Sequence, residues 1–154
     1  HGHEYQGKFE HINAGHIVFP VIRLFQLCSC EFEQYDDSSY LFCLDMRSWF
    51  IAKGECENFG YHLVTINDAD ENEWLDDTID SYSTSYWWAG YNDLTVENYW
   101  DWDGPFATYT NWSSNEPNNL NGEEDCALLN QWEDGTWDDV SCDVNAYYVC
   151  EANP

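Results

Sequence analysis

The stretch "SWFIAKGECENFG", residues 48–60, decides the first element of the fold because its apolar residues recur at helical spacing. Trp49, Ala52, Cys56 and Phe59 are three or four positions apart, which places them on one face of a helix. Gly60 follows the last of them and is a natural stop for a helix. The stretch therefore predicts a helix over residues 48–60 whose apolar face packs on a core.

A second helix is predicted over "NDADENEWLDDTIDSY", residues 67–82, with Asn67 or Asp68 as its cap. The side chains expected to face inward are Trp74, Leu75 and Ile79. Beyond residue 86 the pattern changes to short aromatic runs separated by Asn, Asp, Gly and Pro. Such runs predict strands joined by long loops. The predicted strands are "WWAGY" (87–91), "DCALLNQW" (125–132) and "NAYYVCE" (145–151).

The chain has 154 residues, which favours one domain with a normal core. Its formal net charge is −26, and the charge is unevenly distributed. All four basic residues lie in the first 53 positions, whereas residues 54–154 hold 23 acidic residues and no Lys or Arg. Nucleic acid, heparin and anionic membranes are excluded as partners, because binding phosphate or sulfate needs basic side chains. Neutral ligands and metal cations remain.

Seven cysteines in a small acidic chain indicate a disulfide framework and an oxidising compartment. Their spacing fits no zinc-binding pattern. We therefore expect a secreted, extracellular protein. The printed sequence begins "HGHEYQGK", without a signal peptide, so a secreted protein would be a processed form.

The first 27 residues are predicted to form an extension. Residues 1–15 are polar and are expected to be a tail of low order. The run "HIVFPVIRLFQL", residues 16–27, is apolar at both odd and even positions but is too short to span a bilayer. We expect no membrane insertion, and the run would either pack on the domain or meet a partner chain.

Several landmarks occur in a fixed order along the rest of the chain, and together they resemble the C-type lectin-like domain. They are Trp49, Ala52 and Cys56 at the W-x-x-A-x-x-x-C spacing, "GYHLVTI" (60–66), "WWAGYND" (87–93), "YWDWDG" (99–104), "YTNW" (109–112), "EPN" (116–118), Cys126, "WDD" (137–139), Cys142 and "CE" (150–151). The resemblance implies an α+β fold over residues 28–154. This fold has two helices, small antiparallel sheets, stabilising disulfides and a long calcium-binding loop region.

The resemblance also implies the disulfides Cys56–Cys150 and Cys126–Cys142. A further hairpin disulfide is usual in longer family members, but the counterpart of Cys28 is Ser39, which cannot form one. Cys43 would pair with Cys28 or Cys30, and the sequence does not choose between them. The remaining cysteine, or the apolar run, is a candidate link in a homodimer.

Family lectins bind a sugar through calcium, which takes six to eight oxygen ligands. The 3- and 4-hydroxyls of the sugar fill two positions. Carried over to this chain, the ligands are Glu116, Asn118, Glu124, Asp138 and Asp139. The first four of these would also contact the sugar. In the family the bond before the residue equivalent to Pro117 is cis, and X-Pro is the linkage where cis is least costly.

The tripeptide Glu116-Pro117-Asn118 resembles that of the mannose-type lectins. These select equatorial 3- and 4-hydroxyls, as in mannose and N-acetylglucosamine. The usual Trp-Asn-Asp is here Trp137-Asp138-Asp139, so a carboxylate replaces one amide donor. An ionised Asp138 can still bind calcium, but it cannot donate a hydrogen bond to a sugar oxygen.

A neighbouring calcium site in the family uses an acid four residues before another, and Asp93 and Glu97 have that spacing. Asn119, Glu124 and Asp125 would complete this auxiliary site, with Asn119 in place of a usual Asp. Without cations the crowded carboxylates would repel one another. We therefore expect calcium to stabilise the loop.

Three alternatives bear on function. A glycosidase would need two carboxylates in a cleft, and the candidates Glu123, Glu124, Asp138 and Asp139 instead match a shared metal site, so we expect no enzyme. Sugar stacking on tryptophan is not favoured, because most tryptophans occupy core positions in the family. Glycosylation of the Asn111 sequon is not favoured either, because the sequon lies in a structural segment. The main rival is an acidic calcium-binding protein of the same fold that binds mineral, ice or a protein partner. The intact Glu-Pro-Asn favours the lectin, in the setting of an extracellular animal recognition protein, as in innate immunity.

Overall fold

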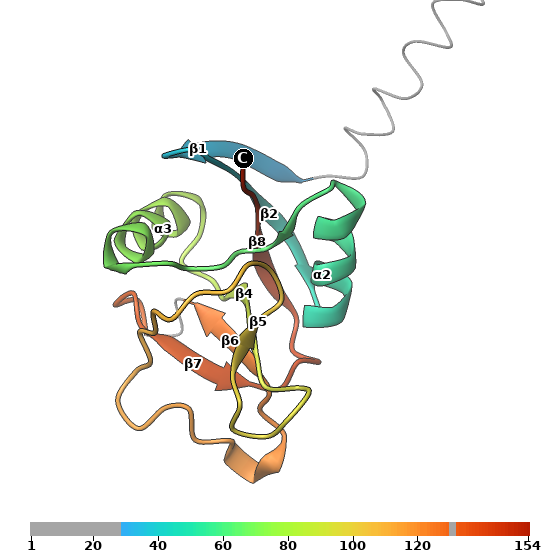
Figure 1. Cartoon of the computed structure of the whole chain (residues 1–154), viewed down its shortest axis with the longest axis vertical. Helices are drawn as coiled ribbons and strands as arrows, with labels where there is room; N and C mark the ends of the chain where they lie inside the picture. The colour runs from blue at the N-terminus through green and yellow to red at the C-terminus, as the bar shows by residue number, and fades with distance from the viewer. Residues whose placement is uncertain (1–28, 130–131) are drawn as a thin grey trace, which may run out of the picture.

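The structure is a computed structural model that describes residues 29–129 and 132–154. Within these residues it contains two α-helices, a short 3-10 helix and eight β-strands, labelled as in Figure 1. In chain order they are β1 (Cys30–Tyr35), β2 (Ser38–Arg47), α2 (Trp49–Asn58), β3 (His62–Leu63), α3 (Ala69–Tyr82), β4 (Trp87–Asn92), β5 (Asp101–Trp102), η1 (Leu120–Gly122), β6 (Cys126–Leu129), β7 (Trp137–Val140) and β8 (Ala146–Ala152). The expected extension, residues 1–27, and Cys28 lie outside the described residues.

The strands form one network in the order β1-β2-β8-β4-β6-β7, with β3 paired to β8 and β5 paired to β4. Every pairing is antiparallel except that of β4 with β8, which is parallel. The small antiparallel sheets implied by the resemblance are thus joined by one parallel pair. In Figure 1, β1 and the C-terminus lie at one end of the molecule, and η1 and the loop between β4 and β5 lie at the other.

Helix α2 covers Trp49–Asn58 of the helix predicted over residues 48–60, and Phe59, expected on its apolar face, is instead its C-cap. The Ser48 side chain caps the first turn by accepting a hydrogen bond from the Ile51 N–H at 3.5 Å. The buried side chains of the helix are Trp49, Ala52 and Cys56. The helix ends before Gly60, whose φ of 77° lies in the left-handed region that glycine adopts at little cost.

Helix α3 begins one residue after its cap, Asp68, whose carboxylate accepts from the Glu71 N–H at 2.9 Å. Leu75 and Ile79 are buried, as predicted. Trp74 is only partly buried, because it covers the edge of the core and stacks on Tyr35 of β1 with ring centroids 4.6 Å apart.

The two helices contribute to different core clusters, on opposite faces of the sheet. Consecutive strand residues point to opposite faces, so Trp87 of β4 joins the cluster that contains Leu75 and Ile79 of α3. The next residue, Trp88, joins the cluster that contains Trp49 of α2. Figure 1 shows the two helices on either side of β2 and β8. This arrangement leaves the far end of the sheet to the long loops.

The structure contains three disulfides, Cys30–Cys43, Cys56–Cys150 and Cys126–Cys142. The last two have the pairing that the resemblance implies. The first answers the question left open for Cys43: Cys30 lies directly opposite it across the β1–β2 pair. Among the described residues, no helix is both long and apolar enough to cross a membrane.

Candidate metal and ligand site

The long segment between β5 and β6 is anchored at the start of β7. Trp112 forms a parallel bridge with Trp137. The Trp137 N–H donates to the Asn111 carbonyl at 2.9 Å, and the Ser113 N–H donates to the Trp137 carbonyl at 2.8 Å. These bonds bring the segment that follows, with its cis Glu116–Pro117 peptide, alongside the carboxylates of β7.

Three of the predicted ligands converge here. Glu116, Asp138 and Asp139 each place a carboxylate oxygen within 4.8 Å of those of the other two. Asn118 adjoins them, because its side-chain amide donates to Glu116 Oε1 at 2.8 Å. Oxygen ligands grouped in this way are those that calcium prefers. We call Glu116, Asn118, Asp138 and Asp139 the primary cluster.

Asp139 also holds the loop in place. Its side chain is only 1% exposed. Its two carboxylate oxygens accept hydrogen bonds from the backbone N–H groups of Asn118 and Asn119, at 3.0 and 2.7 Å respectively. The Asp139 carboxylate on β7 therefore holds the backbone of Asn118 and Asn119 against the sheet.

The primary cluster is electrostatically unfavourable as a set of anions. Burial, with the adjacent carboxylates of Asp139 and Asp138, raises the pKa of Glu116 to about 8. Burial likewise raises the pKa of Asp138, which is 8% exposed. Glu116 Oε2 is buried without a hydrogen-bond partner among the described residues. Buried carboxylates need a compensating positive charge, and a cation at this point would provide it.

A second group of carboxylates lies on the loop that follows β4. Asp93, Glu97 and Asp125 have oxygens within 4.8 Å of one another. Asp93 is 4% exposed; its Oδ2 accepts from the Asn98 N–H at 2.8 Å, whereas its Oδ1 is buried without a partner among the described residues. Burial raises the pKa of Asp93. These three residues are the auxiliary cluster, and they too fit an oxygen-liganded cation.

Two predicted ligands lie between the clusters rather than within them. The Asn119 amide nitrogen donates to Glu97 Oε1, and its side-chain carbonyl accepts from the Glu124 N–H at 3.0 Å. Asn119 therefore presents an N–H, not an oxygen, to the auxiliary cluster. The Glu124 carboxylate is in neither group and accepts from the Leu120 N–H at 2.8 Å. For Asn119 to present its oxygen to the auxiliary cluster, its amide must rotate.

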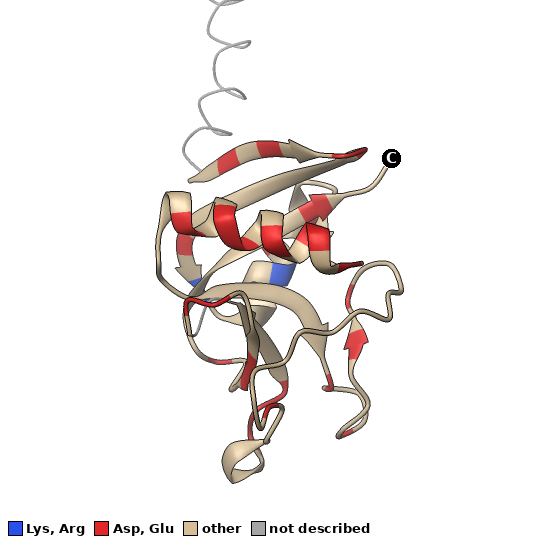
Figure 2. Ribbon diagram, turned by 90° about the vertical axis from the view of Figure 1, so that its left-hand side faces the viewer, with Lys and Arg blue, Asp and Glu red and all other residues tan. Residues whose placement is uncertain are grey.

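No Lys or Arg of residues 29–129 and 132–154 forms an ion pair with these clusters. In the described part of the chain, Arg47 pairs with Asp45, and Lys53 pairs with Glu57 and Asp103. Figure 2 shows Asp and Glu along α3, β1 and the loops, whereas Lys and Arg occupy only small segments. A metal cation is therefore the natural counter-charge for both clusters.

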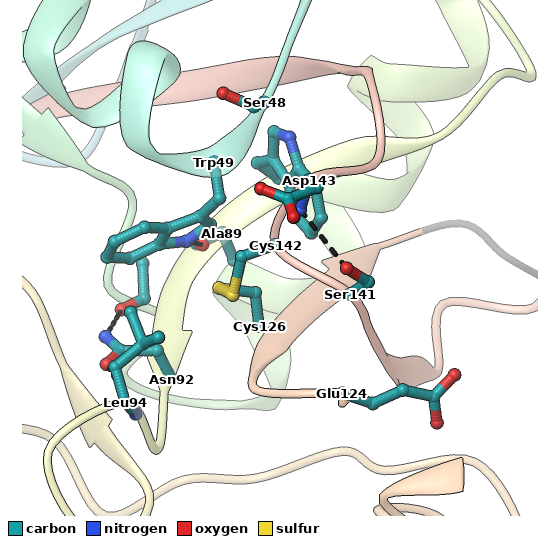
Figure 3. Close-up of a disulfide and its surroundings, with 12 residues drawn as sticks. Ser48, Trp49, Ala89, Asn92, Leu94, Glu124, Cys126, Ser141, Cys142 and Asp143 are labelled. Carbon is teal, nitrogen blue, oxygen red and sulfur yellow. Dashed lines mark hydrogen bonds between the residues drawn. A yellow bond between two sulfur atoms is a disulfide. The ribbon is translucent and has the colours of Figure 1, made fainter. Parts of the chain in front are cut away.

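The disulfide Cys126–Cys142 supports this end of the sheet. It joins the start of β6 to the turn after β7, and so ties the chain next to Glu124 to the chain next to Asp139. Figure 3 shows the disulfide beside the indole of Trp49, with Glu124 directed away from it. The Trp49 indole N–H donates to the Ala89 carbonyl at 2.9 Å, which also fixes helix α2 against β4.

Asn72 is a positioning residue that the sequence analysis missed. Its side-chain oxygen accepts from the Trp137 indole N–H at 2.8 Å, and its amide donates to the Gly135 carbonyl at 2.9 Å. Asn72 thereby fixes the side chain of Trp137, the residue that precedes Asp138. The signal was present, because Asn72 is a polar residue on the same helical face as Leu75 and Ile79. Asn111 donates to the same carbonyl at 2.8 Å, so the amide nitrogen of the sequon is already engaged.

The chain is similar to several known proteins. The family model described as "Lectin C-type domain" matches residues 45–152. The chain is 37% identical to "Hepatic lectin" of Gallus gallus over 126 residues, which are 80% of this chain and 58% of that protein. It is 34% identical to a "Perlucin-like protein" of Mytilus galloprovincialis over 128 residues, 80% of this chain and 81% of that protein.

Among solved structures, the carbohydrate-recognition domain of the mouse scavenger receptor C-type lectin is similar, with a TM-score of 0.72 and 32% identity. The match covers 82% of this chain and 96% of that domain. The chain thus spans little more than half the length of the hepatic lectin, and nearly all of a recognition domain.

Proposed function

The chain belongs to the C-type lectin domain family, and we propose that it is a calcium-dependent lectin for sugars with equatorial 3- and 4-hydroxyls, such as mannose or N-acetylglucosamine. The observation that most supports this proposal is the primary cluster. The Glu116-Pro117-Asn118 segment lies against Asp138 and Asp139 from a strand remote in sequence. The role is binding rather than catalysis.

In this proposal Glu116, Asn118, Glu124, Asp138 and Asp139 hold the calcium ion, and the ion in turn coordinates two neighbouring hydroxyls of the sugar. Ionised carboxylates accept hydrogen bonds, while an asparagine amide donates them. Glu116 and Glu124 would therefore accept from the sugar hydroxyls. The amide of Asn118, which donates to Glu116 in the structure, would donate to a sugar oxygen.

The auxiliary cluster would bind a second cation through Asp93, Glu97 and Asp125, with Glu124 and Asn119 reoriented toward it. Its role would be to order the loop. The loop after β4 and the segment around Asn119 meet at this point, as the hydrogen bond from Asn119 to Glu97 indicates. A cation here would offset the repulsion between them and preform the sugar site.

Calcium is expected to raise the melting temperature of the protein, because an ion that binds only the folded state stabilises it by mass action. At a calcium concentration about 100 times the dissociation constant, one site adds about 2.7 kcal/mol. For a domain of this size that corresponds to a rise of roughly 5–10 °C. Differential scanning fluorimetry with calcium, magnesium or chelator measures it. Equal melting temperatures in calcium and in chelator would contradict cation binding at either cluster.

The wider setting is also proposed. The relatives suggest an extracellular recognition protein in which residues 28–154 form the carbohydrate-recognition domain. Six of the seven cysteines pair within the domain, which leaves Cys28 as the candidate covalent link in a homodimer. A second protomer would add avidity to a weak monosaccharide site.

A second function is favoured by Asp138. A carboxylate at this position lacks the donor that the sugar oxygen needs, and the domain would remain strongly acidic after binding two ions. A calcium-binding protein that recognises mineral, ice or a protein partner without sugar specificity fits those two observations. Calcium stabilisation without glycan binding would favour it over the lectin.

A further inference from the structure

A groove of about 420 Å³ lies beside the auxiliary cluster, on the loop from β4 to β5 and on β5 itself. Its lining includes Asn92, Val96, Tyr99, Trp100, Asp101 and Phe106. The volume is within the range of ligand sites in proteins. None of these side chains is among the proposed metal or sugar ligands, so the groove is a separate feature. The loop from β4 to β5 lies at the same end of the molecule as η1 (Figure 1).

Two aromatic side chains of the groove are largely exposed to solvent. Tyr99 is 76% exposed and Phe106 is 79% exposed. Trp100 is half-buried and lines one side of the groove. Its ring centroid lies 4.7 Å from that of Trp112 and 5.5 Å from that of Tyr91. Exposed aromatic side chains that gather around a hollow mark an interaction site more often than scattered ones do.

Hydrogen bonds hold the backbone of the loop that carries Tyr99. The Tyr99 N–H donates to the Val96 carbonyl at 2.9 Å, and the Asn98 N–H donates to the buried carboxylate of Asp93 at 2.8 Å. A rigid aromatic surface loses little conformational entropy when a ligand binds. The backbone of the loop that carries Tyr99 is therefore preorganised.

The polar groups of the groove favour a cation over a sugar. The Asn92 amide already donates to the Gly90 and Asp101 carbonyls, and its oxygen accepts from the Leu94 N–H. Asp101 is exposed, and one of its carboxylate oxygens accepts from the Trp102 N–H. The described ion pairs involve other acids, so Asp101 has no basic partner in residues 29–129 and 132–154.

We propose that this groove binds an arginine-bearing segment of a protein partner. A guanidinium group stacks on aromatic rings and pairs with carboxylates. Tyr99 and Phe106 would therefore stack on the guanidinium plane, and Asp101 would form an ion pair with its N–H groups. Apolar residues beside the arginine would contact Val96 and Trp100. The charge of the molecule supports this occupant, because residues 54–154 hold 23 acidic residues and no base, and so attract basic partners.

The test is fluorescence anisotropy on the full chain in calcium and excess mannose, with a short labelled peptide in which arginines alternate with leucines. We expect saturable binding that Tyr99→Ala, Phe106→Ala and Asp101→Asn each weaken about three- to tenfold. A peptide with neutral citrulline in place of arginine should bind at least about tenfold more weakly. The peptide carries no sugar and excess mannose competes for the sugar site if that site exists, so the result does not depend on whether the lectin proposal holds.

Matched controls separate the groove from general charge attraction. Phe32→Ala removes an exposed aromatic ring on β1, and Asp77→Asn removes an exposed carboxylate on α3. Both should bind the peptide as the parent does. Equal weakening by Asp77→Asn and Asp101→Asn would overturn the proposal, as would binding that is insensitive to Tyr99→Ala. Neutral oligosaccharides that bind in chelator and lose binding in Tyr99→Ala would also overturn it, in favour of a second sugar site.

Discussion

Asp139→Asn is expected to weaken calcium binding by at least about a hundredfold and to remove calcium-dependent glycan binding. The Asp139 carboxylate is buried in the primary cluster, and both of its oxygens accept hydrogen bonds from backbone N–H groups of the loop. An asparagine would turn one acceptor into a donor that faces the N–H of Asn118 or Asn119. Leaving such a buried donor unpaired costs about 1–3 kcal/mol, so the metal-free domain should also be less stable.

Calcium titration followed by intrinsic fluorescence, together with urea unfolding in chelator, measures both effects. Asp143→Asn is the matched control, because Asp143 is exposed, lies just beyond β7 and is in neither cluster. It should leave calcium affinity and stability unchanged. Calcium binding by Asp139→Asn at the affinity of the parent protein would contradict the assignment of this carboxylate to the metal site.

Asp138→Asn should have the opposite effect on sugar binding and tighten the affinity for mannose. The substitution supplies the amide donor that the usual Trp-Asn-Asp provides and removes a buried negative charge. A hydrogen bond of this kind is worth roughly 1–3 kcal/mol, or about five- to a hundredfold in affinity. Titration calorimetry with mannose at saturating calcium measures the change, and galactose serves as the ligand control. Equal or weaker mannose binding by the variant would contradict the donor argument.

The helices could be predicted from the sequence because their signals are local. The apolar spacing of "SWFIAKGECENFG" and the Asp68 cap of the second helix fix α2 and α3 to within a few residues. The strands β4, β6 and β8 were predicted for the same reason, since aromatic runs bounded by turn residues mark them. Of the strand predicted over residues 125–132, β6 covers Cys126–Leu129, and residues 130 and 131 lie outside the described residues.

The remaining strands depend on partners that the sequence does not reveal. β1 alternates Glu with Phe32 and other residues without a clear apolar face, and it is ordered by pairing along the ten-residue β2. The choice of Cys30 over Cys28 follows from that register, which no spacing rule predicts. β3 and β5 have two residues each, too few for any periodic signal.

The sequence predicts which residues come together at the site, but it does not predict their hydrogen bonds. Glu116, Asp138 and Asp139 do converge, and their role as metal ligands stays a prediction. The orientation of Glu124 toward Leu120 and of the Asn119 amide toward Glu97 depends on which loop donors are within reach. Those contacts are decided by the folded loop, so they are a result of the structure alone.

The central claim is that calcium held at the primary cluster binds a sugar, and a glycan array tests it most directly. The full chain would be applied in calcium and, in parallel, in chelator, with Asp139→Asn as the matched variant. The account predicts signal on mannose or N-acetylglucosamine glycans that disappears in chelator and in the variant. Absence of glycan signal from protein that calcium still stabilises against heat, or glycan signal that survives chelator, would contradict it.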